Sequence, residues 1–273
     1  MVGKRIGMKN IPEKVDKLFE SEEKEFLVMT VNGTYGSQLN GQDYYDKSIN
    51  ILGYIEVESG RTSDIKSRLD WCVKDYTSDD NFEKTGIIYR IKGRLSKTCD
   101  NIYVTEIVSD NEKNDFLENL LTEYKKEVSV NSDVLGKLIL NKELNWYKTE
   151  SDIEWCGGIA GFSISYEEDN INEILPVAED FYRNRHEWDR KARKYASESL
   201  TELANDWQYQ EAEDENEVIE ITEKEFAERL EINDISFYSD GNFDIYYADD
   251  DMFWGHTVIV SGNIKAGFNE AYF

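Results

Sequence analysis

The sequence predicts an α+β protein made of two antiparallel sheets, each covered by helix, with a long helix in the second half. Apolar and polar residues alternate in several segments, most clearly in TGIIYRIKGRLS (85–96), which is typical of strands with one buried face. Apolar residues recur at intervals of three and four in residues 112–127 and 172–207, which is typical of amphipathic helices. With 273 residues and 40% hydrophobic composition, the chain can build two cores.

The first predicted domain spans residues 1–130. A short leading helix is expected at residues 12–20, followed by strands at 26–31, 49–57, 69–73, 87–95 and 101–108. The helix at 112–127 places Phe116, Leu117, Leu120 and Leu121 at helical spacing. The segment VSVNSDVLG (128–136) ends this helical pattern and resumes strand alternation, so the boundary is placed there.

The second predicted domain spans residues 131–273. It opens with short strands joined by polar turns and continues into the long helix, in which Pro176 must lie near the first turn or bend the axis. Thr222 and Glu225 fit a capping box, and the helix that they open should bury Phe226 and Leu230. Residues 235–260 then predict a three-stranded meander, with an Asp240-Gly241 turn.

Charge restricts the classes of partner. The chain has 31 Lys and Arg against 57 Asp and Glu, a formal net charge of -26. Binding to phosphate backbones or anionic membranes needs a basic surface, so direct contact with nucleic acid or membrane is not expected. Such a charge can serve solubility alone, or it can steer association with a basic protein.

Cysteine content indicates the compartment. Cys72, Cys99 and Cys156 are odd in number and widely spaced, which matches neither a disulfide framework nor a zinc ribbon. The N-terminal residues lack the apolar core of a signal peptide, and no apolar run is long enough to span a membrane. These features predict a cytoplasmic protein with no cofactor and no metal.

The segment DMFWGHTVIV contains the main candidate for chemistry, His256. With Asp249, Asp250 or Asp251 orienting its ring, His256 would serve as a general base or a metal ligand. Strand alternation would instead place it on the apolar face of Met252, Trp254 and Val258, as a buried histidine with satisfied ring nitrogens. Both interpretations are open, and the second is favoured.

His186 lies in the long helix and is the other histidine of the chain. It is a solvated helix residue, unless the helix and the last sheet bring it to His256. Trp254, Trp188 and Asp250 are the candidates for protein binding, because tryptophan is enriched in interfaces and an acidic group suits a basic partner. The GxSxG, HExxH and P-loop motifs are all absent.

Four segments of the second half carry a family resemblance: WDRKARKYASESLTELANDW (188–207), ITEKEFAERLEI (221–232), ISFYSDGNFDIYY (235–247) and DMFWGHTVIVSGN (251–263). Together they resemble the bacterial proteins that carry the domain of unknown function 2262, from about Asp133 to the C-terminus. The first half, with GIIYRIKGRL and NDFLENLLTEYKK, is similar to the domain that often precedes it. The resemblance implies no substrate, cofactor or catalytic residue.

The sequence therefore predicts a non-catalytic, acidic binding module that acts on a basic protein, as an immunity or inhibitor protein does. A hydrolase that uses His256 with nearby carboxylates or His186 is the alternative. Mimicry of nucleic acid by regular rows of carboxylates is a weaker one.

Overall fold

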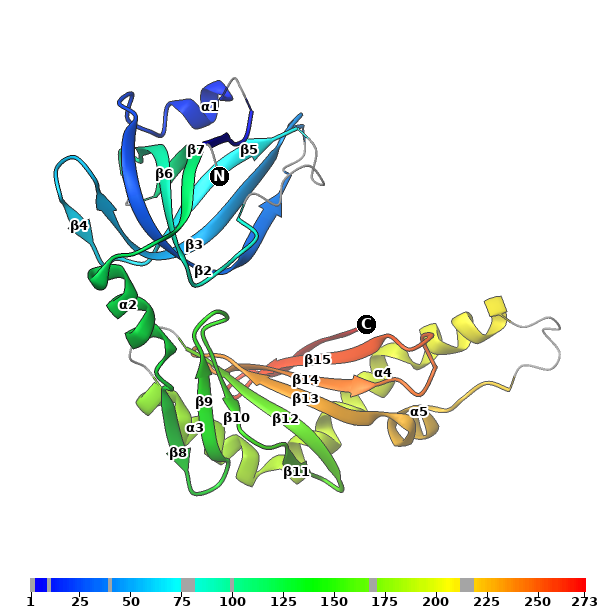
Figure 1. Cartoon of the computed structure of the whole chain (residues 1–273). Helices are drawn as coiled ribbons and strands as arrows, with labels where there is room; N and C mark the ends of the chain where they lie inside the picture. The colour runs from blue at the N-terminus through cyan, green and yellow to red at the C-terminus, as the bar shows by residue number, and fades with distance from the viewer. Residues whose placement is uncertain are drawn as a thin grey trace. The chain divides into compact units, whose positions relative to one another are not determined.

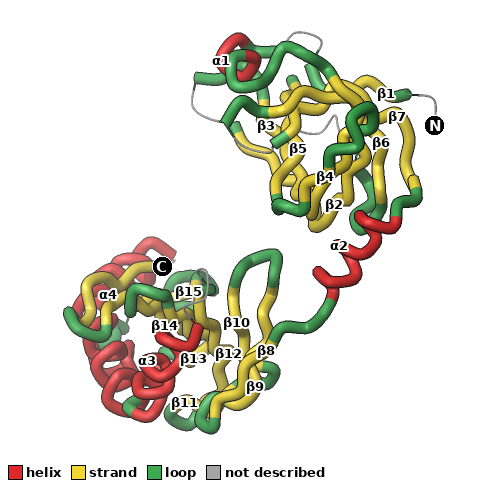
Figure 2. The backbone as a smooth tube through the Cα atoms, turned by 90° about the vertical axis from the view of Figure 1, so that its left-hand side faces the viewer, coloured by secondary structure: helices red, strands yellow, loops and turns green. Residues whose placement is uncertain are grey.

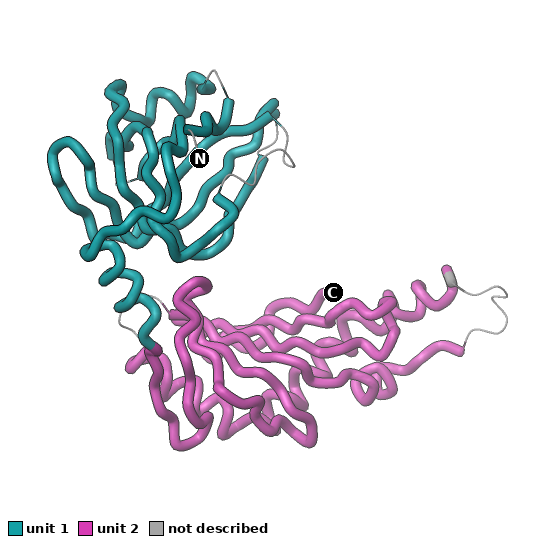
Figure 3. Tube along the Cα trace, in the orientation of Figure 1, with its two compact units in different colours: residues 1–126 teal, residues 127–273 magenta. Residues whose placement is uncertain are grey.

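The computed structural model describes residues 3–8, 11–38, 41–74, 82–98, 101–166, 171–211 and 219–273. The chain folds into two compact units, Met1–Lys126 and Glu127–Phe273 (Figure 3). Each unit has its own sheet and its own buried cluster. Among the described residues, no helix has the length and apolar composition that crossing a membrane requires.

The first unit is built on a closed barrel of five strands (Figure 1, Figure 2). Its elements are β1 (Lys4–Arg5), α1 (Glu13–Asp16), β2 (Lys24–Ser37), β3 (Tyr45–Glu56), β4 (Thr62–Ser63), β5 (Ser67–Val73), β6 (Ile88–Leu95), β7 (Ile102–Glu112) and α2 (Asp115–Lys125). The strands pair in the order β7-β5-β3-β2-β6, and β6 pairs again with β7. Closure gives each of these five strands a partner on both sides.

Strand direction in the barrel follows a Greek-key path. Strands β2, β3 and β5 form an antiparallel meander, β6 returns antiparallel to β2, and β7 lies antiparallel to β6 but parallel to β5, with Leu69 opposite Ile102. This connectivity is that of the OB barrel. Gly93 of β6 permits the close approach of β7, because a Cβ there would lie 2.6 Å from the backbone oxygen of Tyr103.

Successive side chains of the barrel strands point alternately into the inner core and to the outer surface. Phe26, Ile49, Leu69 and Ile91 are fully buried members of the inner cluster. On part of the outside, Leu117 of α2 packs with Met29, Val31 and Leu52. The side chain of Asn114 caps α2 by accepting a hydrogen bond from the backbone N–H of Leu117, so the helix begins at Asp115, three residues after the predicted start.

The described residues of the second unit form a sheet and three helices. Its elements are β8 (Ser129–Ser132), β9 (Gly136–Asn141), β10 (Trp146–Thr149), β11 (Ile153–Trp155), β12 (Gly158–Ser165), α3 (Ile171–Arg183), α4 (Arg185–Glu211), α5 (Glu223–Arg229), β13 (Glu231–Phe237), β14 (Asn242–Ala248), β15 (Thr257–Asn263) and β16 (Gly267–Tyr272). The sheet order is β16-β15-β14-β13-β12-β10-β9-β8, and β11 pairs with β12.

The two sheets confirm the α+β class and correct its details. Each sheet was expected to be purely antiparallel, which is wrong: β5 is parallel to β7, and β12 is parallel to β13. The second parallel pair has a clear cause, because α3, α4 and α5 intervene between β12 and β13 and return the chain to the same end of the sheet. The predicted three-stranded meander also gains a fourth strand, β16.

The long helical segment is divided at Asn184 into α3 and α4. Pro176 lies inside α3, and the break comes eight residues after it. Ala192, Ala196, Leu200 and Ala204 of α4 recur every four residues and are all buried, so one stripe of this 27-residue helix belongs to the core.

The net charge is unequally divided between the units. Residues 1–126 contain 19 Lys and Arg against 23 Asp and Glu, whereas residues 127–273 contain 12 against 34. The first unit is therefore close to neutral, at -4, and the second carries -22 of the total charge of -26. The acidic character of the chain therefore belongs mainly to the second unit.

Candidate functional site

Residues 249–256 form a turn between β14 and β15, so the expectation of a strand from Met252 to Val260 is wrong for its first part. Asp250, Asp251 and Trp254 have positive φ angles of 48°, 62° and 57°, which are left-handed rather than extended values. The extended geometry begins only at Thr257. His256 is consequently exposed rather than buried on an apolar strand face.

The three aspartates of this turn have different surroundings. Asp249 is 2% exposed, and its carboxylate accepts hydrogen bonds from the backbone N–H groups of Asp251 and Phe253. Asp250 pairs with Arg229 of α5, with 2.7 Å between its Oδ2 and the arginine Nε, whereas Asp251 is exposed. Within the described ranges, none of the three hydrogen-bonds the His256 ring, so the acid–histidine pair of the general-base hypothesis is not assembled.

Aromatic side chains surround this turn. The Trp254 ring is 55% exposed, and its centroid lies 4.4 Å from that of Trp207 in α4. His256 and Phe273 also meet Trp207, at centroid distances of 6.2 and 5.1 Å. Trp207, Trp254, His256 and Phe273 are called the Trp254 surface below.

The structure does not bring the two histidines together. His186 is exposed in the first turn of α4, whereas His256 contacts Trp207, 21 residues further along the same helix. At 1.5 Å per residue this separation is about 30 Å. A joint His186–His256 site is therefore excluded by the length of α4.

Trp188, a predicted binding residue, is half-buried. Its ring packs at 5.1 to 5.7 Å from those of Phe181, Phe243 and Phe268. These contacts join α3, α4, β14 and β16, so Trp188 contributes first to the core of the second unit.

A buried polar network beside Trp188 was missed by sequence reasoning. Asp189 accepts hydrogen bonds from Trp155 Nε1 at 3.1 Å and from the Tyr247 hydroxyl at 2.9 Å, and its other oxygen pairs with Arg193 Nε at 2.8 Å. Burial, together with the Asp189 charge, raises the pKa of Tyr247 well above its usual value. The only local signal was the Asp189–Arg193 spacing of four residues, which permits a pair within one helix.

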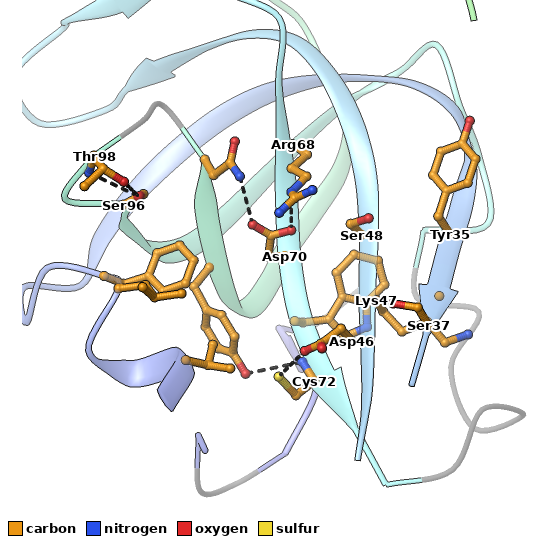
Figure 4. A pocket seen from close by; sticks show the side chains of 17 residues that line it. Tyr35, Ser37, Asp46, Lys47, Ser48, Arg68, Asp70, Cys72, Ser96 and Thr98 are labelled. Carbon is orange, nitrogen blue, oxygen red and sulfur yellow. Dashed lines mark hydrogen bonds and ion pairs between the residues drawn. The ribbon is translucent and has the colours of Figure 1, made fainter. Parts of the chain in front are cut away.

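The first unit contains a second candidate site, a cavity of about 460 Å³ on the outside of the barrel (Figure 4). Its lining comes from the end of α1, the end of β2, the start of β3, from β5, from the segment after β6, and from the start of β7. The pairing of β3 with β5 places Asp46 opposite Cys72 and Ser48 opposite Asp70. Residues distant in sequence are therefore neighbours in the wall of this cavity.

Hydrogen bonds hold the polar side chains of the cavity. Asp70 accepts from Arg68 Nε at 2.8 Å and from Asn101 Nδ2 at 3.2 Å, and the Cys72 thiol donates to Asp46 Oδ1 at 3.4 Å (Figure 4). Burial, with a smaller effect of the Asp46 charge, raises the pKa of Asp70 to about 6 against the opposing effects of Arg68 and Asn101. Sequence alternation alone could have placed Asp70 on the outer face, but not beside Asp46.

The thiols described by the structure are not activated nucleophiles. Burial raises the pKa of Cys72 to about 12 and that of Cys156 to about 11, so both stay protonated near neutral pH. Cys99 lies outside the described residues. Over the described part of the chain, no group of three or more His, Cys, Asp or Glu is arranged to hold a metal ion.

The raised pKa of Asp70 makes the stability of the barrel depend on pH. Because folding raises this pKa from 3.8 to about 6, the stabilisation is fully present below pH about 4 and is lost as the pH rises through about 6. Asp70→Asn removes this titration. As the pH rises from about 4 to about 8, the wild-type protein should therefore lose up to about 3 kcal/mol of unfolding free energy that Asp70→Asn does not lose.

Urea titrations at several pH values, followed by hydrogen exchange of residues 67–73, measure this difference for the barrel. Asp64→Asn is the matched control, because Asp64 is exposed in the same unit and does not line the cavity. A constant difference between Asp70→Asn and wild type across this pH range would show that Asp70 titrates normally.

Comparison with known families covers both units. A domain of unknown function, DUF7021, matches residues 12–124, and the family described as an uncharacterized protein conserved in bacteria, DUF2262, matches residues 132–273. No curated protein and no solved structure matches the chain. Because the second match covers more than half of the chain and agrees with the resemblance of residues 188–263, the protein belongs to the uncharacterized bacterial family DUF2262.

Proposed function

We propose that residues 127–273 form a non-catalytic binding module that docks a basic partner protein on the Trp254 surface. The single observation that supports this most is the position of Trp254, which is 55% exposed at the tip of an acidic turn. An exposed tryptophan is costly to solvate and is among the residues that contribute most to protein interfaces.

The surroundings of Trp254 favour a cationic partner. The unit carries a net charge of -22, and Asp206 and Asp251 are exposed close in sequence to Trp207 and Trp254. An acidic field of this size accelerates encounter with a basic protein, while the aromatic rings supply the desolvated contact. An inhibitor or immunity protein that covers a basic functional surface needs this combination.

The turn is held in place before any partner arrives. Asp249 fixes the backbone at Asp251 and Phe253, and the Arg229–Asp250 ion pair ties the turn to α5. The Phe253 ring is fully buried and stacks on Phe273 at 4.1 Å. Because little freedom remains to be lost at the adjoining Trp254, the contact energy is largely retained on binding.

A reducing compartment is consistent with the described thiols. Cys72 and Cys156 are free cysteines in different units. We therefore place the interaction in the cytoplasm, where structural disulfides are rare.

Affinity purification with matched baits tests the proposal. We expect the full-length wild-type chain to enrich a protein of net positive charge from lysate of the source bacterium, and Trp254→Ala to retain about 30-fold less of it, since interface hot spots contribute about 2 kcal/mol or more. Ile159→Ala is the control, because Ile159 is 70% exposed in β12 and outside the Trp254 surface.

Repetition with the purified partner at low and high salt completes the test. Binding should weaken as salt is added, because the attraction between exposed charges is screened. A partner that binds Trp254→Ala as well as wild type would overturn the proposed surface. The absence of any salt-sensitive basic partner would overturn the proposed function itself.

A further inference from the structure

The cavity in the first unit has the size of a small-molecule site. Its volume is about 460 Å³, within the range of roughly 300–1,000 Å³ that is usual for ligand pockets. It lies in the near-neutral unit, apart from the Trp254 surface, so its role does not depend on the proposed protein binding.

The lining contains both apolar and polar side chains. The apolar residues include Val15, Leu18, Phe19 and Tyr103, and Phe19 packs against the Tyr103 ring at 5.3 Å. The polar residues supply carboxylate, guanidinium, amide and hydroxyl groups, from Asp46, Ser48, Arg68, Asp70, Asn101 and Thr98. A ligand that fits must therefore carry an apolar face and a polar edge.

The carboxylates retain capacity to accept hydrogen bonds. Each oxygen of Asp70 accepts one bond, from Arg68 or from Asn101, and an ionised carboxylate offers about four acceptor positions. Asp46 accepts a single long bond from the Cys72 thiol, which is a weak donor. Hydroxyl groups of a ligand can use the remaining positions, and they can accept in turn from Arg68.

Charge balance in the lining favours a neutral ligand. The lining contains two acidic residues, Asp46 and Asp70, and two basic residues, Lys47 and Arg68. Arg68 is already paired with Asp70, and Lys47 is buried and has an interaction of its own. A phosphorylated ligand would need surplus positive charge, and a polyamine would need surplus negative charge.

We infer that this cavity binds a neutral, polyhydroxylated ligand of the saccharide class. A sugar ring has C–H groups on its face, which suit the apolar side chains of Val15 and Leu18, and hydroxyl groups at its edge, which suit Asp46, Asp70 and Asn101. The carboxylates accept from the hydroxyls, while the Arg68 guanidinium donates to their oxygens. Ser48 lies between the two aspartates on the paired strands and adds a group that both donates and accepts.

Saturation-transfer difference NMR on the full-length protein tests the inference. The probes are chitotetraose, maltotetraose and cellotetraose, with oligothymidylate and spermidine as anionic and cationic comparisons. We expect at least one tetrasaccharide to receive saturation. Asp46→Ala should raise the Kd of that tetrasaccharide by about 10-fold or more, because a hydrogen bond to a charged group is lost. Asp64→Asn should bind as wild type does.

Asp46→Asn retains the shape of the side chain and separates loss of charge from loss of fold, which circular dichroism of each variant also checks. A graded loss, from wild type through Asp46→Asn to Asp46→Ala, supports the site. Three results overturn it: no binding of any tetrasaccharide, equal binding to Asp46→Ala and wild type, or binding of oligothymidylate or spermidine in place of the sugars.

Discussion

Replacing Asp189 with alanine is expected to lower the free energy of unfolding of the second unit by about 3–5 kcal/mol, the usual cost of breaking a buried ion pair. The loss is large because one side chain serves three donors: Trp155 Nε1, the Tyr247 hydroxyl and Arg193 Nε. Without the carboxylate, two neutral donors lose a buried acceptor and the Arg193 charge loses its counterion. The Arg193 guanidinium also lies 5.0 Å from the Tyr247 ring centroid, so its displacement would disturb β14.

Urea unfolding followed by tryptophan fluorescence measures this effect, since five of the six tryptophans lie in residues 127–273. Asp189→Asn should lose less than Asp189→Ala, because the amide oxygen still accepts a hydrogen bond. Glu202→Ala, at an exposed position of the same helix, should stay within about 0.5 kcal/mol of wild type. A similarly small loss in Asp189→Ala would mean that water replaces the carboxylate at little cost.

Structural elements that depend on contacts between residues close in sequence could be predicted. The capping box of α5 is confirmed: Thr222 Oγ1 accepts from the Glu225 N–H at 3.2 Å, and Glu225 Oε2 accepts from the Thr222 N–H at 2.8 Å. Phe226 and Leu230 are buried as expected. The relevant atoms belong to residues three apart in sequence, so the pattern contains nearly all of the information.

Strand direction was not predictable in the same way. Side chains alternate between the faces of a strand whether its neighbour is parallel or antiparallel, so the alternation in β5 and β12 is compatible with either arrangement. The direction of β13 relative to β12 depends on the helical connection between them, and that of β7 relative to β5 depends on closure of the barrel. Both are properties of the whole chain path.

The two candidate sites were also hard to predict, because both depend on contacts between residues that are distant in sequence. DMFWGHTVIV reads as a strand because apolar residues dominate it, and Gly255 is its only local turn signal. The positive φ angles at Asp250, Asp251 and Trp254 are maintained by contacts with Arg229, Trp207 and the buried Asp249. The barrel cavity depends on the register of β3 with β5, which alternation does not determine.

The ring of Phe181 connects four elements of the second core, and its removal has an effect as large as that expected for Asp189. Phe181 is 2% exposed in α3, and its centroid lies 4.8 to 5.7 Å from those of Trp155 in β11, Trp188 in α4, Phe237 in β13 and Phe243 in β14. Phe181→Ala should lower the free energy of unfolding by about 3–5 kcal/mol, through lost burial and the cavity that remains.

Phe181→Leu keeps much of the apolar volume and should cost less than alanine, whereas Arg183→Ala, at a half-exposed position of the same helix, should change little. Urea unfolding measures the loss of unfolding free energy in each variant. Hydrogen exchange shows whether α3 opens alone or together with the sheet. If the ring holds α3 to the sheet, Phe181→Ala should accelerate exchange in α3 and in β13 together. Faster exchange in α3 alone would mean that the helix detaches without the sheet, and that the core of β13 and β14 is stable without it.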